Sequence, residues 1–171
     1  GILKPGVPVV CAPHTAEAAT VIARVAAEHR CPRYTVGAEI LVTPGATDAR
    51  GQTFTVSGRH GVYALTCPLL GAHQQLNAAV AVGMAEVLCD ADEPLTPAAI
   101  RDGIAQVRWP GRLQTLQQAP LLLLDGAHDP AAMAALLDAL AVLAPQRPRR
   151  LVLGIMADKD WRTMLAQAAP G

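Results

Sequence analysis

Aromatic residues are scarce in this chain, at 3% of its 171 residues. Proteins that bind single-stranded nucleic acid stack its bases on aromatic side chains, so this shortage argues against that function. Neither sign of charge is in excess, because 14 Lys and Arg residues balance 14 Asp and Glu residues. No basic surface for a phosphate backbone is therefore expected, and we predict no nucleic-acid partner.

Several common site patterns are also missing. The four cysteines form no C-x-x-C pair, so we expect isolated buried thiols in a reducing cytoplasm. The five histidines show no H-E-x-x-H spacing, and we predict no metal ligands within this chain. The longest apolar helical stretch, around Ala78–Cys89, contains Glu86 and is too short to cross a bilayer. Since the first ten residues also lack the pattern of a signal peptide, we predict a soluble cytoplasmic protein without a membrane partner.

Two catalytic signatures do not occur in the sequence either. There is no G-x-x-x-x-G-K-[ST] loop to cradle the β- and γ-phosphates of a nucleotide, and no G-x-S-x-G nucleophile with a placed histidine. What the chain does have is a high hydrophobic content, 51%, with 16% charged residues, which is typical of an ordered globular protein. Its length allows one domain or two small ones.

The most informative stretch is Leu121–Pro130, with the sequence LLLLDGAHDP. Its leucine run predicts a strand buried on both faces of a parallel sheet. Asp129 followed by Pro130 predicts the start of a helix, because Asp caps exposed backbone N–H groups and Pro suits the first helical position. A second strand is expected at Leu151–Ile155, after the helix. The sequence therefore predicts a β-α-β unit.

This unit would place Asp125 and His128 beyond the carboxyl end of its first strand, where ligands bind in such folds. Gly126, between them, permits a tight turn. An ordinary turn would explain the same two residues, and spacing alone supports both interpretations equally.

The rest of the chain predicts an α/β fold in two parts, residues 1–108 and 109–171, with the boundary between Arg108 and Thr115. The second part has only two clear strands, and the first begins directly in a strand-like segment, so we expect both ends to be cut and the chain to be a fragment. The remaining expected elements are a strand at Val7–Cys11, a helix from about His14 to Arg30, strands at Tyr34–Val36 and Glu39–Val42, a hairpin of Gln52–Val56 and Gly61–Thr66, and helices at Leu76–Leu88 and Thr96–Val107.

His73 and Asn77, in the segment GAHQQLN, are four residues apart and so share one face near the start of a helix. An Asn amide can both donate to and accept from a purine edge, and a His ring can stack or form hydrogen bonds. A capped and hydrated first turn explains the same residues, and without further context it is the better interpretation.

Two other segments carry charged candidates. The Arg112 guanidinium could form paired hydrogen bonds to phosphate or carboxylate, although a surface charge after the Pro-Gly turn is the simpler explanation. Asp158 is expected to cap the next helix, where Lys159 could reach an anion. A solvated helix start explains these two residues equally well.

Five segments, KPGVPVV, LLGAHQQLNAA, RWPGRLQ, LLDGAHDP and GIMADKD, occur in this order along the chain. Together they closely resemble the folylpolyglutamate synthase family, including its bifunctional dihydrofolate synthase members, within the Mur ligase superfamily. The resemblance covers nearly the whole chain. It implies the end of a Mur-ligase-type central ATPase domain in residues 1–108, followed by the first part of a Rossmann-like C-terminal domain.

The resemblance implies an ATP- and Mg²⁺-dependent ligase that adds L-glutamate to the γ-carboxylate of a folate through an acyl phosphate. By motif match, Asn77, Arg112 and Asp125 would bind ATP, and His128 would take part in catalysis, with Lys159 a weaker candidate. One departure is Asp129, where the family usually has Asn, which adds a negative charge near the phosphates. The P-loop and Mg²⁺ ligands are expected outside this chain, the complete enzyme is expected to be a monomer, and the fragment alone is expected to be inactive.

Two other interpretations remain open at this point. A muropeptide-forming Mur ligase or a cyanophycin synthetase would share part of the motif set, although WPGRL and ADKD favour the folate enzyme. The other is a noncatalytic α/β binding module that works through a partner.

Overall fold

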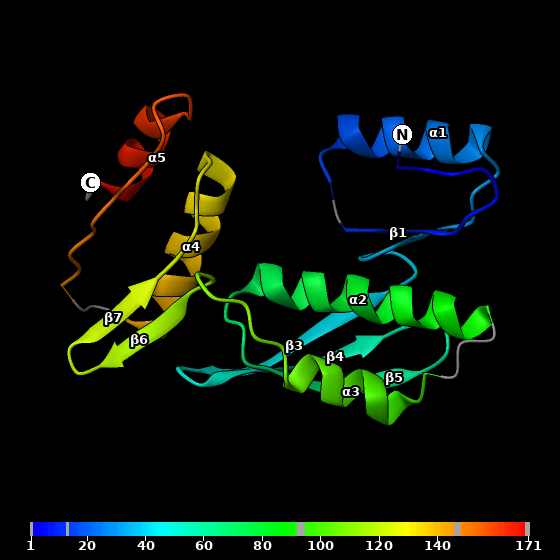
Figure 1. The fold of residues 1–171 in the computed structure, drawn as a ribbon, viewed down its shortest axis with the longest axis horizontal. Coiled ribbons are helices and arrows are strands. Elements are labelled where there is room, and N and C mark those ends of the chain that lie inside the picture. The colour runs from blue at the N-terminus through cyan, green and yellow to red at the C-terminus, as the bar shows by residue number, and fades with distance from the viewer. Residues whose placement is uncertain (1, 13, 92–94, 146–147, 170–171) are drawn as a thin grey trace.

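The computed structural model describes residues 2–12, 14–91, 95–145 and 148–169, and it confirms the α/β class (Figure 1). In chain order the elements are β1 (Val9–Cys11), α1 (Ala16–Glu28), β2 (Arg33–Thr35), β3 (Leu41–Asp48), β4 (Gly51–Ser57), β5 (Val62–Cys67), α2 (Ala72–Asp90), α3 (Pro97–Ala105), β6 (Gln114–Gln118), β7 (Leu121–Leu124), α4 (Pro130–Leu143) and α5 (Trp161–Ala168).

The centre of the molecule is an antiparallel sheet in the order β3-β4-β5. Alternate residues of β4 and β5 are buried, as expected for strands with one covered face, and the predicted hairpin is confirmed. Helices α2 and α3 cover that face (Figure 1). The resulting core includes Phe54, Val56, Leu65, Val82 and Ile100.

The N-terminal strand and helix form as predicted. Strand β1 pairs in parallel with β2, and the Thr15 hydroxyl caps α1 by accepting a hydrogen bond from the Ala18 N–H. This small unit rests on α2 at Gly83, where an added Cβ would collide with the side chains of Ile40 and Val10. Close approach of the two parts therefore requires glycine at this position.

The C-terminal part differs from the prediction in one respect. Strand β7 does not lie in a parallel sheet; it pairs antiparallel with β6, and Leu122 and Leu124 are 51% and 47% exposed. Residues 151–155 form no strand, so the expected β-α-β unit is absent from the described residues. The physical reason is local. Only a short turn separates the polar segment Gln114–Gln118 from β7, so the two segments pair as an antiparallel hairpin.

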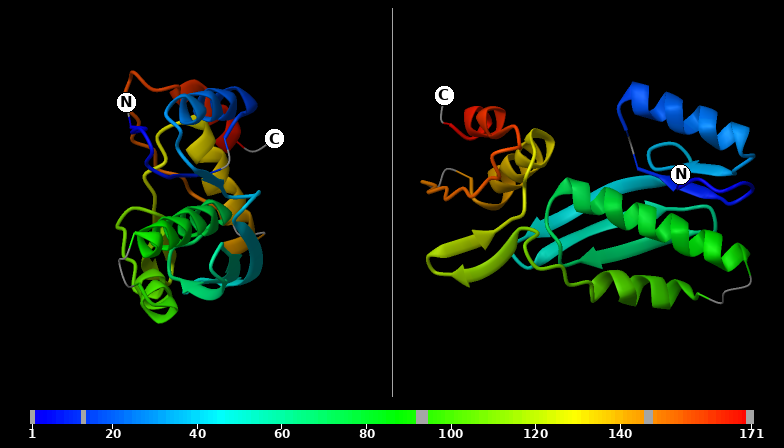
Figure 2. Two further views of the ribbon diagram at one scale, coloured as in Figure 1. Left: turned by 90° about the vertical axis from the view of Figure 1, so that its right-hand side faces the viewer. Right: turned by 45° about the horizontal axis from the view of Figure 1, so that its top comes forward.

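A second core joins β7, α4 and α5 to the preceding part of the chain. Met133, Leu136 and Met164 are buried there, and they pack with Leu70, which lies between β5 and α2. The lobe of α4 and α5 and the lobe of α1 rise from the same side of the molecule, near opposite ends of α2 (Figure 1, Figure 2). The start of α2 therefore lies at the joint with the C-terminal lobe.

None of the helices in the described parts of the chain has the length and apolar character needed to span a bilayer.

Candidate functional site

Asp125 follows β7 directly, and its carboxylate connects two loops. Its Oδ2 accepts a hydrogen bond from the Leu113 N–H at 2.8 Å, and its Oδ1 accepts one from the Ala127 N–H at 2.8 Å. A carboxylate has about four lone-pair sites, so both oxygens keep capacity for a further donor. Asp125 is thus a turn residue that also holds the neighbouring loop, and it remains able to accept a bond from a ligand.

The loop held by Asp125 is the segment that carries Arg112. It is also tied by the Gly126 N–H, which donates to the Gly111 carbonyl at 2.8 Å. Gly111 and Leu113 both have positive φ, +75° and +44°, and Leu113 is buried in the second core. The left-handed conformation of Leu113 is unfavourable by itself, so its hydrogen bond to Asp125 and its burial must stabilise it.

Arg112 lies between these two residues and is half-buried. Within the described ranges it takes part in no ion pair. A half-buried guanidinium on a loop fixed at both sides can bind an incoming anion with little loss of conformational entropy.

His128 lies in the same loop as Asp125, two residues before α4 begins at Pro130. Its Nδ1 is 3.0 Å from the Gly126 carbonyl oxygen, and the side chain is 62% exposed. Asp129 caps the helix as predicted, since its Oδ1 accepts a hydrogen bond from the Ala132 N–H at 2.7 Å. The loop carbonyl orients the imidazole while most of the ring stays open to solvent.

The start of α2 supplies the other candidates. Asn77 is exposed, and its Nδ2 donates to Gln74 Oε1 at 3.1 Å. His73, four residues earlier, is half-buried, and burial lowers the pKa of its imidazole. The Asp125 charge raises that pKa and the Arg112 charge lowers it, both by smaller amounts. His73 is therefore within electrostatic reach of the loop residues.

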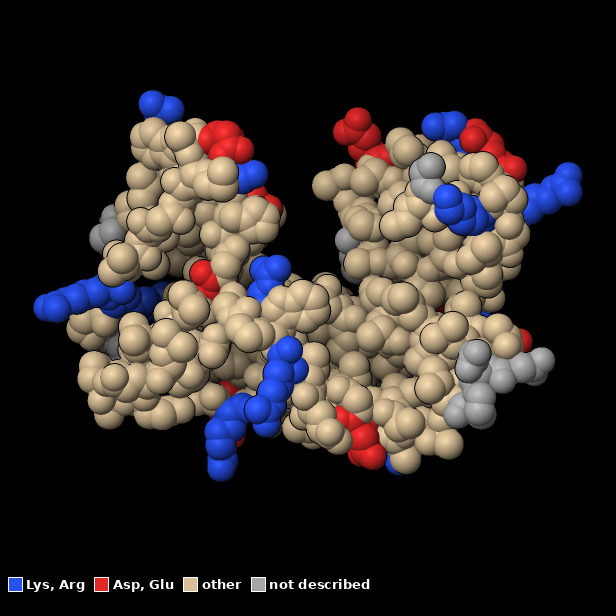
Figure 3. Space-filling view, in the orientation of Figure 1, with Lys and Arg blue, Asp and Glu red and all other residues tan. Residues whose placement is uncertain are grey.

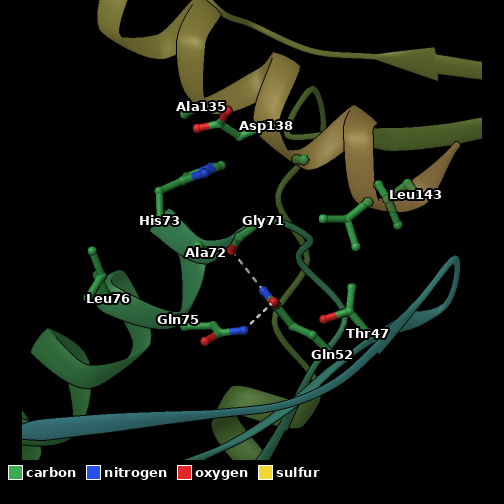
Figure 4. A pocket seen from close by; sticks show the side chains of 12 residues that line it. Thr47, Gln52, Gly71, Ala72, His73, Gln75, Leu76, Ala135, Asp138 and Leu143 are labelled. Carbon is green, nitrogen blue, oxygen red and sulfur yellow. Dashed lines mark hydrogen bonds between the residues drawn. The ribbon is translucent and has the colours of Figure 1, made fainter. Parts of the chain in front are cut away.

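A cavity of about 320 Å³ lies between the start of α2 and the second half of α4 (Figure 4). His73 reaches across it toward α4, where Asp138 also lines the space (Figure 4). On the opposite wall, Gln52 Nε2 donates to the Gly71 carbonyl at 3.0 Å, and Gln75 Nε2 donates to Gln52 Oε1 at 2.8 Å. These residues come from distant parts of the sequence, so no motif could have indicated the cavity.

The surface is deeply hollowed between the α1 lobe and the α4–α5 lobe, above α2 (Figure 3). Two of the residues predicted from the sequence, Arg112 and Asp125, lie close together, because the Leu113 N–H next to Arg112 donates a hydrogen bond to Asp125. His128 lies in the same loop as Asp125. No hydrogen bond among the described residues links Asn77 to these three. The prediction that Asp158 caps α5 is wrong. Asp160 is the cap and accepts a hydrogen bond from the Thr163 N–H, because the helix starts at Trp161.

Lys159 lies beside Asp158, with 3.6 Å between its Nζ and the carboxylate Oδ2. Among the described residues, no group of three or more His, Cys, Asp and Glu side chains is arranged to hold a metal ion.

Comparison with known proteins finds a matching family, similar sequences and similar solved structures. The family described as Mur ligase, glutamate ligase domain, matches residues 111–171. The folylpolyglutamate synthase of Lacticaseibacillus casei is 37% identical over 166 residues, which is 96% of this chain and 39% of the relative. A solved FPGS–AMPPCP–folate complex matches with a TM-score of 0.92 and 35% identity, over 98% of this chain and 41% of that one.

A Mycobacterium tuberculosis folylpolyglutamate synthase complexed with ADP has a TM-score of 0.78 and 28% identity, over 93% of this chain and 36% of that one. The chain thus spans about two fifths of the length of the relatives that it matches.

Proposed function

We propose that this chain forms one wall of the ATP site of a ligase. The premise is that residues 111–171 belong to the Mur ligase glutamate ligase family. The ligase joins L-glutamate to the γ-carboxylate of a folate. The observation that carries the proposal is the Asp125 carboxylate, which joins the Arg112 loop to the loop between β7 and α4. A site that must place charged groups around a nucleotide needs such a fixed arrangement before the ligand arrives.

Each candidate residue has a chemical role in this proposal. The Arg112 guanidinium pairs with phosphate oxygens, for which its planar donor geometry is suited. The Asp125 carboxylate accepts a hydrogen bond from a sugar hydroxyl through its remaining lone pairs, and the Asn77 amide contacts the base edge.

The proposed reaction has two steps. The folate carboxylate attacks the γ-phosphate of ATP, which yields an acyl phosphate and ADP, and the glutamate amine then displaces phosphate to form the amide. His128, oriented by the Gly126 carbonyl and open to solvent, is placed to hold the glutamate or the acyl phosphate. The ligands for Mg²⁺ and the P-loop are expected in other parts of the ligase, as the family resemblance implies.

The experiment is an exchange of segments. Residues 1–171 replace the matching segment of the L. casei enzyme, and phosphate release is measured with ATP, glutamate and a folate. We expect turnover that depends on all three substrates, whereas the 171-residue chain alone gives none. Turnover with nucleotide-linked muropeptides in place of folates would instead favour the muropeptide ligase, and no turnover with either by a folded chimera would contradict the proposal.

Variants of the chimera separate the roles. Arg112→Ala removes a phosphate contact and should lower kcat/KM by about 10- to 100-fold, as expected for the loss of a charged hydrogen bond. Arg101→Ala is the matched control, because Arg101 is exposed on α3. Equal activities of the two variants would remove Arg112 from the site.

A further inference from the structure

We propose that Gln114 is a positioning residue for Arg112, because its side chain holds the backbone from which the guanidinium projects. The Gln114 Oε1 accepts a hydrogen bond from the Gly111 N–H at 3.0 Å. This inference rests on the proposed function, since it concerns the arginine that would pair with the phosphates of the nucleotide.

The residue before Arg112 needs such a bond because packing does not hold it. Gly111 has a φ of +75°, and an added Cβ there would meet nothing within 4 Å. A glycine in open space has more backbone freedom than any other residue. Leu113, on the other side of Arg112, is buried in the second core. The conformation of Gly111 therefore depends on its hydrogen bonds.

Three hydrogen bonds hold the peptide groups on both sides of Arg112. Before it, the Gly111 N–H donates to Gln114 Oε1 at 3.0 Å, and the Gly111 carbonyl accepts from the Gly126 N–H at 2.8 Å. After it, the Leu113 N–H donates to Asp125 Oδ2 at 2.8 Å. Gln114 thus fixes the residue before Arg112 as Asp125 fixes the residue after it.

Gln114 is itself well placed to act as an anchor. It is the half-buried first residue of β6 and pairs with Leu124 of β7, which Asp125 follows directly. Both accepting side chains therefore start from the same end of one strand pair. The Gln114 side chain reaches back three residues to a backbone N–H, as the glutamine of a helical capping box does. A group carried by a strand is held more precisely than one carried by a loop.

The direction of the Arg112 side chain matters for its proposed task. A guanidinium binds a phosphate most strongly through two parallel N–H groups, which requires a fixed approach. Within the described ranges no ion pair holds Arg112 itself. If Gln114 releases Gly111, the side chain must be ordered when the nucleotide binds, and that ordering lowers the affinity.

Amide hydrogen exchange, followed by NMR on the 171-residue chain, tests the hydrogen bond. Gln114→Met removes the accepting oxygen at similar size, so the Gly111 N–H should exchange roughly 5- to 100-fold faster. Gln114→Glu keeps an accepting oxygen and should keep the slow exchange. Gln118→Met, at the exposed end of β6, is the matched control and should leave Gly111 unchanged. Unchanged exchange in Gln114→Met, or equally fast exchange in Gln114→Glu, would overturn the assignment.

The kinetics of the chimeric enzyme test whether Gln114 acts through Arg112. Gln114→Met should lower kcat/KM for ATP by roughly 3- to 10-fold, the effect of one hydrogen bond, mainly through a higher KM. Added to Arg112→Ala, it should cost nothing further, because the guanidinium that it positions is gone. A residue that only supports the fold would reduce activity in both backgrounds.

The outcomes separate the two proposals. If Arg112→Ala lowers kcat/KM but Gln114→Met does not, or if the two losses multiply, the inference is wrong and the proposed function stands. If Arg112→Ala has no effect, the proposed role of Arg112 fails and the inference fails with it. Should Gln114→Met not fold, Gln114→Thr replaces it, because threonine suits a strand and its hydroxyl lies too near the backbone to reach Gly111.

Discussion

Removal of the Glu86 carboxylate should destabilise the chain strongly, because this buried group holds the turn between β4 and β5. Glu86 is 0% exposed, and its oxygens accept hydrogen bonds from the Arg59 N–H at 2.9 Å, the His60 N–H at 2.9 Å and the Tyr63 hydroxyl at 3.1 Å. These bonds attach the turn between β4 and β5 to α2. Since α2 carries His73 and Asn77 at its other end, Glu86 also helps to fix the position of the candidate site.

The size of the effect follows from the bonds that each substitution breaks. Glu86→Ala leaves three donors without their acceptor, and at about 1–3 kcal/mol for each unsatisfied group the loss should be about 3–9 kcal/mol. Glu86→Gln keeps one acceptor oxygen but turns an N–H₂ group toward the Arg59 N–H. Its amide is less costly to bury than a carboxylate, so we expect a smaller loss of about 1–3 kcal/mol.

Urea denaturation followed by circular dichroism measures both variants, with Glu17→Gln on the exposed side of α1 as the control. We expect the free energy of unfolding to decrease in the order control, Glu86→Gln, Glu86→Ala. A loss below about 1 kcal/mol for Glu86→Ala would refute the reasoning, because it would mean that the three donors find other partners at no cost.

Three further predictions concern single groups. Burial, with a smaller contribution from the Glu86 hydrogen bond, raises the pKa of Tyr63 to about 12. This raised pKa stabilises the fold below pH ~10, where unfolded tyrosine is still protonated, and the stabilisation should be lost as pH rises toward about 12. In an ultraviolet titration Tyr63 should be the last tyrosine to ionise. Ionisation of Tyr63 near pH ~10 would contradict this prediction. Gly58→Ala should lower the midpoint of urea unfolding, because the new Cβ collides with the Glu86 carboxylate; an unchanged midpoint would mean that the turn moves freely. Asp125→Asn replaces one accepting oxygen by a donor, so the backbone N–H of Leu113 or of Ala127 loses its hydrogen-bond partner. Amide hydrogen exchange at that N–H should accelerate by roughly 5- to 100-fold. Unchanged exchange would show that the carboxylate does not hold the loop.

The elements that the sequence predicted correctly are those with strong local signals. Asp129 caps its helix as predicted, and Thr15 and Thr96 cap helices that form where the sequence predicts them. The central hairpin was predictable because one covered face imposes strict alternation on its strands.

The errors arise where pairing depends on neighbours. The leucine run Leu121–Leu124 is a strand, but its partner is the polar segment Gln114–Gln118, which has no strand-like alternation of its own. The apolar segment Leu151–Ile155 resembles a strand in composition but has no partner in the described structure. Composition indicates that a segment can be a strand, whereas pairing decides whether it is one.

The candidate site was predictable only in part. Motifs identified Arg112, Asp125 and Asn77, and their roles remain predictions. The hydrogen bond from Leu113 to Asp125 joins residues twelve positions apart through a backbone N–H, which no side-chain pattern reveals. The closeness of His73 to Gly71, and its place beside α4, likewise depend on tertiary structure that no sequence pattern indicates.

A crystal structure of the chimeric enzyme with AMPPCP tests the central claim most directly. We predict that the nucleotide lies in the hollow above α2, with Arg112 on phosphate oxygens, Asp125 on a sugar hydroxyl and Asn77 on the base edge. AMPPCP bound with none of these three residues within hydrogen-bond distance would contradict the claim that this chain forms one wall of the ATP site.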